Sequence, residues 1–104
     1  MDKRFAIELT KVYINKLITN NININSAYLF GSFAKGIINK NSDIDLALII
    51  DDYINDFETQ IKLMTLREGD ETIIEPHIFR KDDFNKNNPF INEIINSGIR
   101  IEIN

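Results

Sequence analysis

Apolar side chains recur at helical spacing in three segments of the chain. They predict helices over residues 2–20, 54–68 and 89–97. Asn88 and Pro89 are typical of the cap and first position of a helix, and Gly98 suits the end of that helix. The middle helix is expected to point four apolar residues inward: Ile54, Phe57, Ile61 and Met64.

The first predicted helix has an unusually wide apolar arc. Its apolar positions at helical spacing are Phe5, Ala6, Leu9, Val12, Tyr13 and Leu17, and three isoleucines (Ile7, Ile14 and Ile18) widen the arc further. A helix that covers one core needs an apolar stripe of about 100°. Two interpretations stay open: the second apolar face meets a partner, or it simply adds exposed aliphatic side chains.

Shorter apolar runs predict four strands, over residues 27–30, 44–50, 73–79 and 99–104. Pro76 cannot donate a hydrogen bond within a sheet, so its strand should lie at an edge or be irregular, for example through a bulge. The last strand alternates apolar and polar residues, which favours a half-buried edge strand. The pattern predicts an α/β (α+β) fold, with helices packed on a small mixed sheet of about four strands.

Length and composition limit the classes of protein. A chain of 104 residues supports one core, so residues 1–104 are expected to form a single domain. With 43% apolar and 27% charged residues, the composition is that of a globular protein. The net charge of −4 argues against a general nucleic-acid coat, and no direct nucleic-acid binding is expected. Binding of one nucleotide through a metal remains compatible with this charge.

Several kinds of site are excluded by residue content. The chain has no cysteine, which excludes disulfides and thiolate chemistry, and His77 is the only histidine, which excludes multi-histidine metal sites. No apolar run approaches the ~20 residues of a membrane span, and the N-terminus lacks a signal-peptide core. A soluble cytoplasmic protein is therefore expected.

One stretch of the sequence combines several features that suit phosphate chemistry. A strand ends at Gly31-Ser32, where a short helix that Ser32 can cap would offer free N–H groups to a phosphate. After ten residues, Asp43 and Asp45 enter the next strand on one face, while its isoleucines and leucines share the other. Because the first strand ends where the second begins, the two should be antiparallel neighbours. Paired carboxylates opposite a phosphate cradle suit Mg²⁺.

The pattern Gly-Ser, ten residues, then Asp-x-Asp resembles the nucleotidyltransferase superfamily typified by DNA polymerase beta. The forms GSFAKG and SDIDL, from Gly31 and from Ser42, resemble the minimal nucleotidyltransferase (MNT) proteins more narrowly. The segments 74–79 and 88–90 are also similar to one branch of that group. The resemblance covers nearly the whole chain and implies a polymerase beta-like fold.

The resemblance implies roles for particular residues. Asp43, Asp45 and Glu75 would be the catalytic carboxylates, and together they would bind Mg²⁺, as two ions. Glu75 replaces the usual aspartate of the wider superfamily, and its alternative role is that of a salt-bridged strand residue. Gly31 and Ser32 would bind the nucleotide, which is ATP in this interpretation.

Other residues near the motif have more than one possible role each. Lys35 either approaches a phosphate or is solvated, and His77 either contacts nucleotide, orients Glu75, or faces the core or a partner. Arg80 and Lys81 meet the triphosphate or a partner, or lie on a plain surface. Phe30, Phe33, Phe57 and Phe79 are expected to pack in the core.

The resemblance also implies a partner. MNT proteins often act as antitoxins to a HEPN-domain ribonuclease toxin, and some transfer AMP from ATP to a tyrosine of that toxin. This chain is expected to leave no residues for a second domain, so another protein or a second copy would present the acceptor. Two alternatives stay open: a weakly catalytic antitoxin that acts by contact, and transfer to a small molecule such as an antibiotic.

Overall fold

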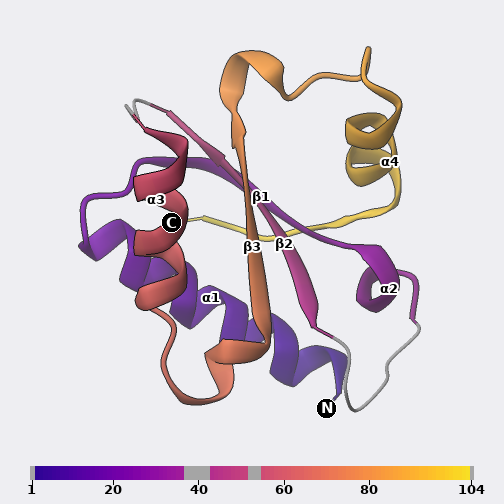
Figure 1. Cartoon of the computed structure of the whole chain (residues 1–104). Helices are drawn as coiled ribbons and strands as arrows, with labels where there is room; N and C mark the ends of the chain where they lie inside the picture. The colour runs from indigo at the N-terminus through magenta and orange to yellow at the C-terminus, as the bar shows by residue number, and fades with distance from the viewer. Residues whose placement is uncertain (1, 37–42, 52–54, 104) are drawn as a thin grey trace.

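The computed structural model describes residues 2–36, 43–51 and 55–103 (Figure 1). The helices are α1 (Lys3–Thr19), α2 (Gly31–Ala34), α3 (Asp56–Thr65) and α4 (Pro89–Ser97), and two 3-10 turns are η1 (Gly69–Ile73) and η2 (Lys81–Asp83). The strands are β1 (Ile24–Phe30), β2 (Ile44–Ile50), β3 (Ile74–Arg80) and β4 (Ile99–Arg100). Within the described ranges, no helix has the length and apolarity needed to cross a bilayer.

The four strands form one mixed sheet in the order β3-β2-β1-β4. β1 pairs antiparallel with both β2 and β4, whereas β3 runs parallel to β2. The parallel pair needs a long connection, which α3 and η1 provide. The predicted antiparallel neighbours, the mixed four-stranded sheet and the edge position of the strand that holds Pro76 are all confirmed.

The pairing of β2 with β3 is continuous from Ile44 opposite Ile74 to Ile50 opposite Arg80. Of the two alternatives predicted for Pro76, the edge position is therefore realised and a bulge in this pair is not. An edge position already accommodates a residue without an N–H donor, so no bulge is needed. The register shift that the structure does show lies in β1, between Ile24 and Ser26.

β2 is buried on both faces of the sheet. Its even-numbered residues Ile44, Leu46, Leu48 and Ile50 join the main core beneath α1 and α3. Ala47 and Ile49 belong to a smaller cluster on the opposite face, which includes Ile94 of α4. In Figure 1, α2 and α4 accordingly lie on one side of the molecule and α1 and α3 on the other.

Only part of the wide apolar arc of α1 enters the core. Ala6, Tyr13, Ile14 and Leu17 are buried, whereas Phe5, Val12 and Ile18 are exposed. Asp2 caps the helix by accepting a hydrogen bond from the Phe5 N–H at 2.7 Å. The arc therefore has a buried half and a solvent-facing half.

The prediction for the inward face of α3 is wrong. Phe57 is 73% exposed, and Ile61 and Met64 are also exposed. The helix carries two competing apolar faces, and contacts outside the helix select the one with buried Leu63. On that side, Gln60 donates to the Pro76 carbonyl at 2.8 Å, and the Leu63 carbonyl accepts from the Tyr13 hydroxyl at 2.5 Å.

The ends of α3 also differ from the prediction. Asn55 caps the helix by accepting from the Glu58 N–H at 3.0 Å. Ile54, which was expected to point inward, lies outside the described residues. The helix stops at Thr65 because Arg67 turns back over its end, and its side chain donates to the Met64, Thr72 and Ile74 carbonyls.

The end of α4 matches the prediction. Asn88 caps the helix, Pro89 is its first residue and Gly98 follows its last turn. Gly98 has an ordinary φ of −76°. Glycine is needed here because there is no room for a side chain, and not because of the backbone conformation. A Cβ at this position would collide with the Ile94 carbonyl and lie 2.9 Å from that of Leu29. The close approach ties α4 to β1.

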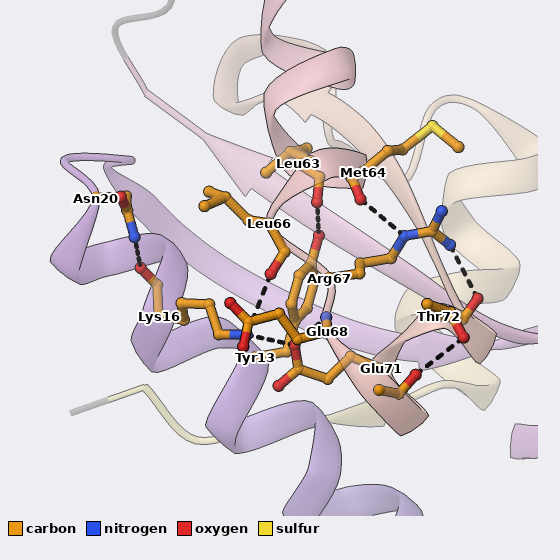
Figure 2. Close-up of polar contacts among 11 residues, drawn as sticks. Tyr13, Lys16, Asn20, Leu63, Met64, Leu66, Arg67, Glu68, Glu71 and Thr72 are labelled. Atoms are coloured by element: carbon orange, nitrogen blue, oxygen red, sulfur yellow. Dashed lines mark hydrogen bonds and ion pairs between the residues drawn. The ribbon is translucent and has the colours of Figure 1, made fainter.

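A polar network fastens the connection before β3 to α1 (Figure 2). The Lys16 ammonium donates to Glu71 Oε1 at 2.5 Å and to the Leu66 carbonyl at 3.1 Å. The same Glu71 oxygen accepts from the Glu68 N–H at 2.9 Å. Because Glu71 is almost fully buried, removal of Lys16 would leave a buried charge without its partner, which is costly.

Tyr13 lies in the same region, with its hydroxyl buried against the Leu63 carbonyl (Figure 2). Burial raises the pKa of Tyr13 well above its ordinary range; the Arg67 charge opposes this rise and Glu71 adds to it. The folded protein thus holds this proton more tightly than the unfolded chain does. The corresponding stability is fully present below about pH 10 and is lost as the pH rises above that value.

We expect the unfolding free energy to fall between pH 8 and pH 11, and Tyr13→Phe to remove about 1 kcal/mol of that fall. At pH 8 the variant should be less stable by about 1 kcal/mol, because the Leu63 carbonyl loses its donor. Urea unfolding of both proteins at the two pH values measures these differences. Equal pH dependence in the two proteins would contradict the assignment.

Candidate functional site

The turn from β1 into α2 brings the backbone of Gly31 against a carboxylate. Phe30 pairs with Asp45 across the β1–β2 ladder, so the next residue, Gly31, lies beside the Asp45 side chain. Gly31 has a φ of +74°, and a Cβ there would lie 2.5 Å from Asp45 Oδ2. Both the left-handed backbone and the close approach therefore require glycine.

Asp45 is the centre of a cluster formed with two residues of β3. The register pairs Asp45 with Glu75 and places His77 one pair further along the same face. His77 Nε2 is 3.1 Å from Asp45 Oδ1 and 4.0 Å from Glu75 Oε1. Ligand atoms of all three residues lie within 4.8 Å of one another. The structure thus brings together Asp45, Glu75 and His77.

The two oxygens of Asp45 have different surroundings. Oδ1 faces the His77 ring and Oδ2 faces Gly31. The side chain is 31% exposed, so solvent reaches it. One oxygen is therefore held in place by β3, and the other is directed to the turn where the motif predicts phosphate.

Asp43 does not join this cluster. It precedes β2 and is exposed, and the three-residue group does not include it. It shares the face of Asp45 by alternation, but it lies beyond the first paired residue of the strand. Its assignment as a metal ligand and catalytic residue stays a prediction.

Ser32 and Lys35 lie on the opposite side of Asp45 from β3, in and just after α2. Ser32 is exposed, and the prediction that it caps the helix is wrong: Phe30 occupies the cap position, without a side-chain hydrogen bond. Lys35 forms an exposed ion pair with Glu93 of α4, at 2.9 Å. Such pairs are weak, so the Lys35 ammonium can exchange its partner for a phosphate at small cost.

A pocket opens between α2 and α4, next to Asp45. Its volume is about 290 Å³. Gly31, Ala34 and Lys35 line one side, and Phe90, Glu93, Ile94, Ser97 and Gly98 line the other, with Phe30 and Asp45 also contributing. In the sequence, Phe90 stands out only as part of a segment that resembles the family, and Glu93 carries no signal of its own. Helical periodicity places both on α4, but no local pattern shows that α4 packs beside α2.

Aromatic rings cover the sheet around the cluster. The ring centres of Phe30 and His77 are 5.1 Å apart, and those of Phe30 and Phe90 are 5.8 Å apart. Phe79 packs in turn on Phe84 and Phe90. Phe33 is buried, and Phe30 and Phe79 are half-buried; the expectation of core packing is wrong only for Phe57. The rings hold His77 on the face that also carries Asp45.

Beyond the cluster, Arg80 forms an ion pair with Asp56 at 3.2 Å, while Lys81 is exposed at the start of η2. Arg80 and Lys81 both follow His77, which is the last residue of β3 in the cluster. Their contact with a triphosphate or a partner stays a prediction.

The donor set fits a divalent cation through its carboxylates. Mg²⁺ prefers oxygen ligands, usually one or two carboxylates together with substrate phosphates, and Asp45 and Glu75 supply carboxylates at adjacent register positions. Imidazole is a less suitable ligand for Mg²⁺ than for softer ions. His77 is accordingly better placed to orient Asp45 than to bind magnesium.

The chain is similar to known proteins over most of its length. Residues 13–103 match the family model described as "Polymerase beta, Nucleotidyltransferase", and the chain belongs to that family. Its fold matches the crystal structure of a protein from Sulfolobus solfataricus that is named as a candidate nucleotidyltransferase. The TM-score is 0.63 at 16% identity, over 90% of this chain and 77% of that one. No curated protein matches the chain.

These comparisons confirm the polymerase beta-like fold and a nucleotidyltransferase domain. The narrower resemblance to toxin–antitoxin MNT proteins stays a hypothesis. Families of this kind use divalent metal, which agrees with the carboxylates of the cluster.

Gly31→Ala should displace the Asp45 carboxylate, because the new methyl group would occupy the space of Oδ2. We expect a loss of about 1–2 kcal/mol in unfolding free energy from the left-handed backbone, together with a change in the ring signals of His77. Since His77 is the only histidine, its NMR signals need no assignment.

Gly69→Ala is the matched control. Gly69 has a φ of +57° but open space around its Cβ position. It should show a similar loss of stability in urea unfolding and leave the His77 signals unchanged. His77 signals that stay unchanged in the Gly31 variant as well would contradict the contact.

Proposed function

We propose that this protein transfers AMP from ATP, with Mg²⁺, to a hydroxyl group of a partner protein. The observation that carries the proposal is the position of Asp45, with one oxygen toward Gly31 and the other on His77, and with Glu75 on the adjacent strand. The family supports nucleotidyl transfer in general. The nucleotide, the metal and the acceptor are proposals.

In the proposed reaction, the acceptor hydroxyl oxygen attacks the α-phosphorus of ATP. A new P–O bond forms, the bond from the α-phosphorus to the bridging oxygen breaks, and pyrophosphate leaves. Two bound Mg²⁺ ions would neutralise charge on the phosphates and position them. The residues proposed to hold it are Asp45 and Glu75, with Asp43 as a third ligand.

The chain's own groups supply positioning and proton transfer. The backbone at Gly31 and the Ser32 hydroxyl would donate to the phosphates, and Lys35 would leave Glu93 for a phosphate oxygen. Glu75 is half exposed at 51% of its side chain, so an acceptor hydroxyl can reach it and give up its proton. His77 keeps Asp45 oriented through its hydrogen bond.

The proposed acceptor is a tyrosine of a HEPN-domain toxin, so that the chain would act as an antitoxin. The resemblance of the motifs supports this partner. The exposed apolar residues of α1, Phe5 and Val12 among them, support contact with a partner protein. The sequence leaves open a second partner for this face of α1, namely a second copy of the chain in a homo-oligomer.

A second candidate is neutralisation by contact, with little or no transfer. It is favoured by the position of Asp43 outside the cluster and by His77 within it. A site with only two carboxylates in place would bind metal weakly until a nucleotide or partner arrives.

We expect Asp45→Asn to lower AMP transfer at least about a hundredfold, because the variant lacks the carboxylate charge that would hold Mg²⁺ at the phosphates. Glu75→Gln should lower it as well, through loss of the proton acceptor. Intact-mass spectrometry of a HEPN-domain partner, after incubation with the protein, ATP and Mg²⁺, measures the AMP added.

Asp51→Asn is the matched control, since Asp51 follows the other end of the same strand. It should transfer AMP as the wild type does. A double variant, Asp43→Asn with Asp45→Asn, that transfers nothing but still neutralises the partner would move the conclusion to neutralisation by contact. Full transfer by Asp45→Asn would refute the proposed site.

A further inference from the structure

The pocket between α2 and α4 extends away from the side where Glu75 lies. Gly31 and Asp45 form its wall toward the cluster, and no residue of β3 lines it. Glu75 and His77 of β3 therefore lie on one side of Asp45, and the pocket opens on the other. If Glu75 faces the acceptor, the pocket is on the nucleotide side of the reacting centre.

The lining of this pocket does not suit a chain of phosphates. Among the described residues that line it, Asp45 and Glu93 carry carboxylates and Lys35 is the one cation. That cation is already paired with Glu93. The net charge of this described lining is negative, so phosphates would be held only at the rim next to Gly31 and Lys35.

The remaining lining suits a flat apolar ring. Phe30, Phe90, Ile94 and Ala34 contribute apolar surface. The Phe90 side chain is about half exposed, so its ring is accessible to a ligand. A volume of about 290 Å³ is near the lower end for small-molecule sites, which is room for a ring and not for a whole nucleotide.

We infer that this pocket holds the base of the nucleoside triphosphate, with Phe90 packed against the ring. The inference rests on the proposed function and adds the residues that hold the base. When Lys35 leaves Glu93 for a phosphate, the Glu93 carboxylate at the rim can accept a hydrogen bond from an N–H group of the base. Phe90 can stack on any of the bases, because every base has a flat apolar face.

The experiment compares two ligands that share phosphates and differ in the base. Binding of ATP and of inorganic tripolyphosphate, each with Mg²⁺, is measured by calorimetry for the whole chain. Phe90→Ala removes the stacking ring, and Ser97→Leu fills the pocket from the end of α4. Phe57→Ala is the control, because Phe57 is an exposed phenylalanine on α3, outside the pocket.

We expect both pocket variants to raise the dissociation constant for ATP about tenfold or more and to leave that for tripolyphosphate unchanged within about twofold. Phe57→Ala should change neither constant. Thermal unfolding identifies any variant that has lost its fold, and Ser97→Leu keeps the test open if Phe90→Ala is such a variant.

Three results would overturn the inference. If the pocket variants bind ATP as the wild type does, the base lies elsewhere and the proposed function stands. If both ligands weaken equally in folded variants, the pocket holds phosphates and not the base. If the wild type binds neither ligand with Mg²⁺, the proposed function fails, and the assignment of the pocket fails with it.

Discussion

The burial of β2 on both faces is the constraint on which the rest of the structure depends. A strand that is covered on both sides must be apolar along nearly all its length, and its residues from Leu46 to Ile50 are all buried. Helices α1 and α3 cover one face, and α4 with the aromatic rings covers the other. β1 and β3 occupy its two edges, so every other strand and helix is placed relative to this one.

This burial also determines where a carboxylate can stand. In the middle of β2, an aspartate would be desolvated without a counterion, which is costly. At the start of the strand, Asp45 stays partly solvated and has His77 beside it. The mixed sheet then brings two different neighbours to it: the antiparallel β1 delivers the Gly31 turn, and the parallel β3 delivers Glu75. The Gly31 turn and Glu75 thus meet at one residue of β2, which is Asp45.

Features that depend on neighbouring residues could be predicted from the sequence, and those that depend on distant packing could not. The strand, the Gly31 turn and the alternation of β2 are local, and they were predicted together with the fold. The face of α3 was not, because Gln60 and Tyr13 select it through contacts with distant segments. The pocket was missed for the same reason, since it forms only when α4 packs beside α2.

The outer edge of β3 has a consequence for the behaviour of the protein in concentrated solution. An uncovered edge strand is a template on which another chain can add a strand, and this is a route to aggregation. Here the carbonyls of Ile74 and Pro76 already accept from Arg67 and Gln60, and Pro76 has no N–H to offer. Since alternate residues of a strand turn their backbone groups to the same side, these features fall on one edge. The strand that carries Glu75 and His77 is thereby a poor template for cross-β growth, and the other sheet edge, β4, spans only Ile99–Arg100.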